Sequence, residues 1–211
     1  GKKPLIEKYS IHLQEGDPEC IGHPKLYSHV FLDKLFDELG LEDFFRSYKG
    51  FSKIQYDVLN FTRLLVYGRI LNPDSKIATL EQNNDYYTPL LKNFNKYNVY
   101  DTLDFIYENK EKIIRRMNTS LVKKWHRNPE IIFYDVTNFF FETSDPDEDI
   151  FDEDGNIIET GIRKMGVSKE NRKQPIVQMG LFMDDQGLPI SIEAFPVSYT
   201  HLRAHETLAN L

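Results

Sequence analysis

The hydrophobic pattern of this chain changes its period once, and that change constrains the fold more than any other feature. From residue 25 to about residue 128, apolar residues recur at the three- and four-residue spacing of helices. At "RNPE", residues 127–130, the pattern becomes the two-residue alternation of strands. We therefore expect an α+β protein in which a helical N-terminal domain, residues 1–128, is followed by an antiparallel sheet.

Local signals place the ends of the expected helices. The helix in "PKLYSHVFLDKLFDELG" should stop at Gly40, a residue suited to a C-terminal cap, and the helix in "FSKIQYDVLNFTRLLVYGRILNP" should be ended by Pro73. The longest helix should begin at Asp101, a good N-cap, and continue to Trp125. Its lysines and arginines could contact DNA phosphates, but a solvated helix face is the commoner arrangement.

Three strands are expected after the period changes. They are "IIFYDVTNFFFE" at residues 131–142, "QPIVQMGLFMD" and "LPISIEAF", with "DDQG" as a tight reversal between the last two. Pro189 suggests that the third strand is at an edge. The loop between the first two strands holds an acidic run, residues 145–154, with seven carboxylates in a chain of net charge −7. We expect this run to be a flexible, solvated insertion.

Asp135 is the one charged residue in the interior of the first expected strand, which ends at Glu142 and whose other residues suggest burial. Burying a lone carboxylate costs several kcal/mol unless a metal, a cation or a raised pKa compensates. A stiff strand holds such a carboxylate in a fixed position, as a divalent-metal ligand requires. The alternative is a buried aspartate that hydrogen-bonds to neighbouring amides or to an arginine.

Three separated blocks resemble one family. "RILNPDSKIAT", "YDVTNFFFE" and "GVSKENRKQPIVQMGLFMDDQGLPISIEAFP" occur in the order found in bacterial insertion-sequence transposases of the DDE class, in the IS-four-like group. The resemblance implies that residues 129–196 are the first part of a ribonuclease H-like catalytic core, interrupted by the acidic insertion. It also makes Asp135 the first acid of the catalytic, metal-binding triad. Two Mg²⁺ (or Mn²⁺) ions would serve DNA cleavage and strand transfer in the complete parent protein.

The resemblance also carries expectations about partners. Lys169 and Arg172 match the family's "SK…R" pattern and would contact DNA phosphates, although they could equally be solvated loop charges. The expected partners are the terminal repeats of the insertion sequence and target DNA, and the parent could act as a homodimer. No apolar run approaches the ~18 residues of a membrane span, so no membrane partner and a cytoplasmic location are expected.

The chain departs from the family after "FP". Residues 197–211 match nothing in the family and resemble a translated sequencing-adapter artefact; a short natural helix is the alternative. The family's second Asp and its Glu are not matched, and Asp184, Asp185 and Glu193 do not replace them. We therefore expect a fragment that is inactive by itself. The competing hypotheses are a non-catalytic DNA-binding or regulatory remnant of a transposase, and an unrelated metal-dependent nuclease.

Overall fold

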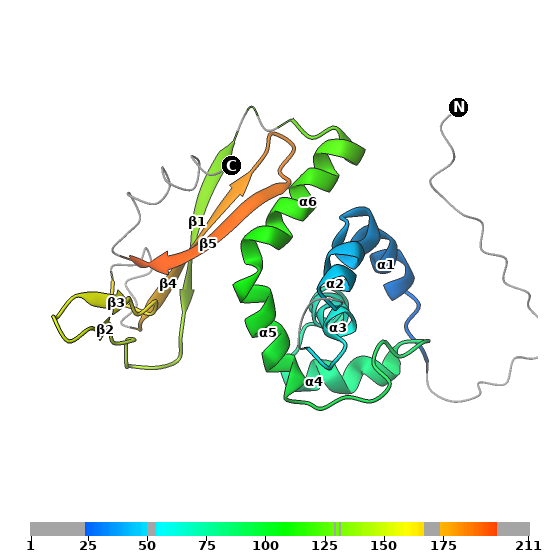
Figure 1. Ribbon diagram of the computed structural model, residues 1–211, viewed down its shortest axis with the longest axis horizontal. Coiled ribbons are helices and arrows are strands. Elements are labelled where there is room, and N and C mark those ends of the chain that lie inside the picture. Colours follow the sequence, from blue (N-terminus) through cyan, green and yellow to red (C-terminus); the bar gives the residue numbers. More distant parts are fainter. Residues whose placement is uncertain (1–23, 50–53, 129, 131, 167–173, 198–211) are drawn as a thin grey trace, which may run out of the picture.

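The computed structural model describes residues 24–49, 54–128, 130, 132–166 and 174–197. Within these residues, six α-helices precede a three-stranded antiparallel sheet, and a two-stranded hairpin lies between the first and second strands of that sheet (Figure 1). The helices are α1 (His29–Glu38), α2 (Leu41–Lys49), α3 (Val58–Leu71), α4 (Lys76–Glu81), α5 (Asn98–Glu108) and α6 (Lys110–Trp125). The strands are β1 (Phe133–Phe140), β2 (Ile150–Phe151), β3 (Ile157–Glu159), β4 (Ile176–Met183) and β5 (Pro189–Pro196). The α+β class expected from the sequence is confirmed.

Local capping explains where several helices begin and end. Gly40 follows α1 with φ +72°, a left-handed conformation that glycine adopts without a Cβ clash. The Asp57 side chain accepts a hydrogen bond from the backbone amide of Asn60 and caps α3, and Ser75 does the same for α4 through Ala78. The expected helix ends are confirmed: α1 ends before Gly40 and α3 ends before Pro73.

The single long helix expected from Asp101 to Trp125 is wrong. The chain forms two helices, α5 and α6, that meet at Asn109. The Asn109 side-chain amide donates to the carbonyl of Phe105 at 2.9 Å, so it bonds to a carbonyl at the end of α5. Asp101 lies in the first turn of α5, which begins three residues earlier.

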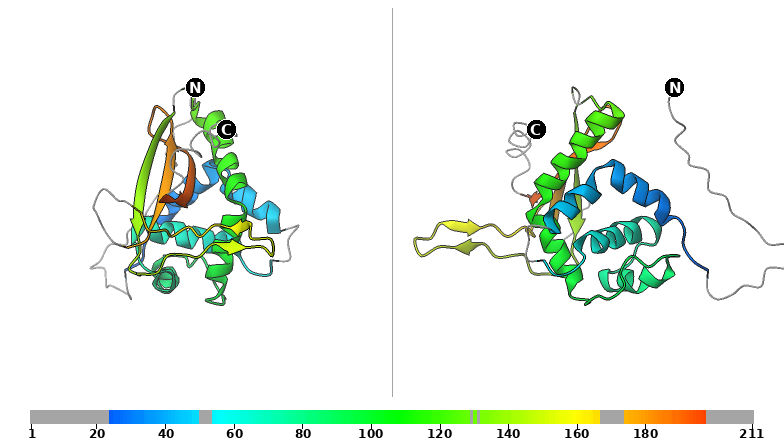
Figure 2. Two further views of the ribbon diagram at one scale, coloured as in Figure 1. Left: turned by 90° about the vertical axis from the view of Figure 1, so that its left-hand side faces the viewer. Right: turned by 45° about the vertical axis from the view of Figure 1, so that its right-hand side comes forward.

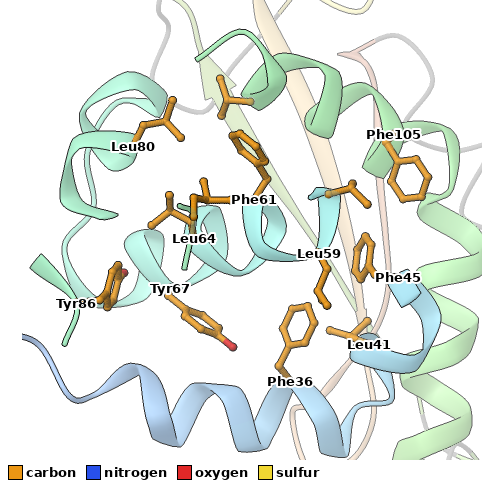
Figure 3. Packing of buried hydrophobic residues seen from close by; sticks show 13 residues of the cluster. Phe36, Leu41, Phe45, Leu59, Phe61, Leu64, Tyr67, Leu80, Tyr86 and Phe105 are labelled. Carbon is orange, nitrogen blue, oxygen red and sulfur yellow. The ribbon is translucent and has the colours of Figure 1, made fainter. Parts of the chain in front are cut away.

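Aromatic and aliphatic side chains from several helices form one core. Figure 3 shows Phe36 of α1, Phe45 of α2 and Tyr67 of α3 turned toward one another. Phe36 and Phe45 stack with ring centroids 6.1 Å apart, and Phe45 packs on Phe105 of α5 at 5.9 Å. This core ties the first five helices together by burial of apolar surface.

The sheet has the strand order β1–β4–β5, with antiparallel pairing throughout, as the alternating pattern predicted. The β4–β5 turn contains Gly187, at φ +77°, where the sequence reads "DDQG". Figure 1 shows α5 and α6 between the sheet and the other helices. Strand β5 lies nearest to α6, and β1 forms the opposite edge of the described sheet.

Candidate functional site

Strand β1 holds Asp135 near its middle, opposite Leu181 of β4. The strand alternation sends Phe133, Asp135 and Phe139 to one face of the sheet. Asp135 is exposed, so the expectation that its carboxylate is buried is wrong. The physical reason is that β1 is an edge strand of the described sheet and that no described element covers this face.

The uncovered face is largely apolar. Phe133 is 55% and Phe139 45% exposed, and half-buried aliphatic residues of β4 (Val177, Met179, Leu181 and Met183) lie beside them. Asp135 is the one carboxylate that the described strands place there. Its negative charge and the burial of Tyr134 both raise the pKa of the Tyr134 hydroxyl, with burial the larger cause.

The opposite face of the sheet packs against α6. Lys110, at the start of α6, forms an ion pair with Glu193 of β5 at 2.7 Å, and Asn118 donates to the carbonyl of Ile190 at 2.8 Å. Phe182 and Phe195 are buried on this side. Among the residues that the structure describes, the sheet is therefore covered by α6 on one face and uncovered on the face that carries Asp135.

The other acids of the sheet are engaged elsewhere. Glu193 pairs with Lys110, and Asp184 is buried against Arg127, 2.6 Å from its Nε atom. Across the described ranges, no group of three or more His, Cys, Asp or Glu side chains is arranged to hold a metal ion. Asp135 by itself supplies one carboxylate, so the described residues do not fit a two-metal centre.

Two of the predicted site residues lie outside the described part of the chain. Lys169 and Arg172 fall within residues 167–173, and the tail expected to be an artefact falls almost entirely within residues 198–211. The prediction of phosphate contacts therefore stays a prediction. Asp135 is the predicted site residue whose surroundings the structure gives.

Most of the basic residues of α6 bond within the chain. The bonds to distant residues are Lys110 with Glu193, Arg116 with Asp43, Lys124 with the Glu38 carbonyl and, just after α6, Arg127 with Asp184. Lys112 donates to Asn109, one turn away, at 3.3 Å. Arg115 and Lys123 are exposed and have no ion pair among the described residues. The sequence pattern alone did not separate the basic residues that bond within the chain from the exposed ones, because most of the partners come from distant parts of the chain.

The acidic run is largely exposed, in line with the expected solvated insertion, and it forms a two-stranded hairpin that the sequence did not predict. Strands β2 and β3 pair antiparallel, and Arg163 Nε bonds to Asp147 at 2.7 Å at the base of the hairpin. Lys164 Nζ bonds to Asp149 at 2.8 Å. These hydrogen bonds lower the pKa of both carboxyls, most strongly through the two basic side chains.

A second cluster of charges lies on the helical part, around Arg63. Its guanidinium contacts Glu42 at 2.6 Å, Asp37 at 3.1 Å and Asp33 at 3.4 Å. Arg63 also borders a cavity of about 110 Å³ whose lining includes Asp57. Three carboxylates around one cation hold α1, α2 and α3 together.

Comparison of the chain with protein-family models, with curated proteins and with solved structures gave no significant match. No described helix is both long and apolar enough to cross a membrane.

Proposed function

We propose that this chain is part of a DNA transposase of the DDE class, with its sheet forming the first strands of a ribonuclease H-like core. The observation that carries the proposal is the position of Asp135, near the middle of the first strand of a β1–β4–β5 antiparallel meander that follows a helical region. The "YDVT" block that resembles the family lies on this strand.

The open face of the sheet supports the proposal. A carboxylate on a rigid strand, accessible and surrounded by apolar side chains, is well placed to contribute to a site completed by further chain segments. Mg²⁺ or Mn²⁺ would supply the activation of a nucleophile for phosphodiester cleavage in such a site. The described residues do not hold such an ion, and the role proposed for Asp135 is to contribute one ligand.

DNA binding is the first test of this proposal. Fluorescence anisotropy of a labelled duplex should show binding of the 211-residue chain that weakens linearly in log salt. Lys169→Ala and Arg172→Ala should each reduce the slope by about 1, as loss of one phosphate contact predicts, whereas Asp135→Asn should leave the slope unchanged. Absence of binding at low salt would contradict the proposal.

Nuclease assays separate the proposed transposase from its alternatives. We expect no nicking of duplex DNA by the 211-residue chain with Mg²⁺ or Mn²⁺, because one carboxylate cannot hold two ions. Nicking that disappears in Asp135→Ala would instead support a nuclease whose site other acids complete. A longer protein that includes this chain should cleave its DNA ends and lose cleavage in Asp135→Asn.

A non-catalytic DNA-binding remnant is the second candidate. The absence of an assembled cluster of metal ligands in the described residues favours it over an independent nuclease. DNA binding without cleavage by the longer protein would support this candidate and contradict the catalytic one.

A further inference from the structure

The β2–β3 hairpin projects away from the body of the molecule. We define the acidic hairpin as residues 147–163, which contain β2 and β3. Figures 1 and 2 show it extending beyond the sheet and away from α6 of its own chain. At ~3.3 Å per residue, its arm from Asp147 to Asp154 reaches on the order of 25 Å.

Specific bonds stabilise the acidic hairpin at both ends. Ion pairs of Asp147 with Arg163 and of Asp149 with Lys164 close its base. At the tip, the Asp152 carboxylate accepts hydrogen bonds from the backbone amides of Asp154 and Asn156. An isolated two-stranded hairpin is only marginally stable in water, so these bonds supply stability that the two short strands lack.

The surface of the acidic hairpin combines charge with exposed apolar side chains. Residues 147–163 contain seven carboxylates and one basic residue, Arg163, which pairs with Asp147 at the base. Four large apolar residues are more than half exposed: Ile150 53%, Phe151 55%, Ile157 51% and Ile158 66%. Apolar side chains gathered on a projecting arm are typical of a protein-binding surface, and the carboxylates argue against a DNA phosphate backbone as the partner.

A complementary surface lies on α6. We define the α6 stripe as Lys112, Arg115, Thr119, Val122 and Lys123, which share one side of the helix by their spacing. All five are exposed. The stripe therefore presents Arg115 and Lys123, the Lys112 ammonium, which also donates to Asn109 at 3.3 Å, and the apolar side chain of Val122, which is 47% exposed.

The dimensions of the two surfaces agree. Helix α6 has 16 residues and is ~24 Å long, close to the length of the hairpin arm. Arg115 and Lys123 lie eight residues apart, which is ~12 Å along the helix. Glu159 pairs with Ile150 across the hairpin, and Glu153 lies three residues beyond Ile150, ~10 Å along the arm.

We propose that two copies of this chain form a symmetric dimer in which each acidic hairpin lies along the α6 stripe of the other copy. The two-fold symmetry repeats each contact, so no binding surface is left to recruit a third copy. The second contact forms within an existing complex and therefore strengthens the dimer. Opposite charges set the orientation, and burial of Phe151 and Ile157, which pair across the hairpin, supplies the apolar part of the affinity. The inference does not depend on the proposed function.

Sedimentation of charge-reversal variants tests the dimer. We expect the 211-residue chain to dimerise and to dissociate as salt screens the contact. Glu153→Lys with Glu159→Lys should weaken dimerisation at least ~10-fold, and Arg115→Glu with Lys123→Glu should do the same. Neither pair of side chains has a bond to another described side chain, so the fold should tolerate both changes.

Combining all four reversals restores opposite charges across the contact. This variant should regain the wild-type dimer affinity within ~3-fold, which a merely destabilised protein would not do. Glu81→Lys with Asp185→Lys is the matched control, since it makes the same charge change at exposed positions outside the proposed contact, and it should dimerise like wild type.

Three results would overturn the proposal. They are a chain that stays monomeric at low salt, reversals in the acidic hairpin that leave the dimer intact, and a four-fold variant that fails to recover. A monomeric chain would indicate that the acidic hairpin binds a different protein, one with a basic and apolar surface. A dimer lost in Phe139→Lys but unaffected by hairpin reversals would instead place the contact at the β1 edge.

Discussion

Arg127 and Asp184 form a buried ion pair that joins the end of α6 to the β4–β5 turn. The Arg127 Nε atom lies 2.6 Å from the Asp184 carboxylate, and their side chains are 2% and 1% exposed. The guanidinium also donates to the carbonyls of Leu188 and Pro189, at 2.9 and 2.6 Å. This pair fixes where the helical part meets the sheet, and neither residue belongs to the proposed DNA site.

Removing one partner of this pair should be strongly destabilising. Arg127→Met leaves the Asp184 carboxylate buried without its cation, and we expect the free energy of unfolding to fall by about 3–5 kcal/mol. Urea denaturation measures the loss. The double variant Arg127→Met/Asp184→Leu should recover part of it, because no unpaired charge remains buried; a double variant less stable than Arg127→Met would contradict this account.

The same pair should govern unfolding in acid. Burial alone would raise the pKa of Asp184, but the hydrogen bonds from Arg127 and from the amides of Leu188 and Gln186 bring it below its ordinary value. A lowered folded-state pKa gives stability that is present above about pH 4 and is lost as the pH falls through the folded-state value. Urea midpoints from pH 7 to pH 2 should therefore decline more steeply in wild type than in Asp184→Asn.

Gly180 should not tolerate a side chain. A Cβ there would lie 2.8 Å from Cε2 of the Tyr134 ring and 3.2 Å from Phe195. We expect Gly180→Ala to lower the free energy of unfolding by about 1–3 kcal/mol through overpacking. Removing the ring in Tyr134→Val should reduce the loss of unfolding free energy that Gly180→Ala causes. A double-mutant cycle measured by urea denaturation checks this. An additive cycle would show that the ring does not cause the penalty.

Asp37 should titrate well above an ordinary aspartate. The Asp37 side chain is 52% exposed, but its partial desolvation, followed by a hydrogen bond to Glu42, raises the pKa of Asp37 to about 6. The same bond is the main cause that lowers the pKa of Glu42 to about 2. Stability contributed by protonated Asp37 is therefore present below about pH 4 and is lost as the pH rises through about 6. ¹³C NMR of the carboxyl groups should show the Asp37 midpoint near pH 6, and in Asp37→Asn the Glu42 midpoint should rise. An Asp37 midpoint near pH 4 would show that Asp37 holds no proton in a hydrogen bond to Glu42 at neutral pH.

The β1 edge should promote higher-order association. Strand β1 pairs on one side with β4, its other side is unpaired within the described sheet, and Phe139 is exposed on it. Phe139→Lys should lower light scattering on mild heating several-fold. Phe31→Lys removes an aromatic side chain that is 72% exposed on α1 and is the matched control, which should change scattering little. Equal effects of the two variants would show that general hydrophobicity drives association.

Local sequence determined the elements that depend on near neighbours. The change of period at residues 127–130 separated helices from strands, and Gly40 and Pro73 marked helix ends correctly. The pairing of β4 with β5 was predictable because a tight turn joins them, and two strands joined by a tight turn pair antiparallel. Each of these signals acts through hydrogen bonds or steric limits within a few residues.

Other features depended on partners that the sequence does not reveal. The break at Asn109 escaped prediction because the apolar spacing continues across it, and periodicity does not register a side chain that bonds to the preceding turn. The acidic hairpin was missed because the acidic run matches no motif in the sequence, whereas in the structure Arg163 and Lys164 pair with two of its carboxylates.

Asp135 and Asp184 show most clearly what the tertiary structure decided. The sequence placed Asp135 on an apolar strand, which suggested a buried carboxylate, and Asp184 at the tip of a hairpin. In the structure, Asp135 is exposed because no described element covers its face, and Asp184 is buried because Arg127, 57 residues away, pairs with it. Periodicity fixes the side of a strand that a residue occupies, but whether that side meets solvent or protein depends on how distant segments pack.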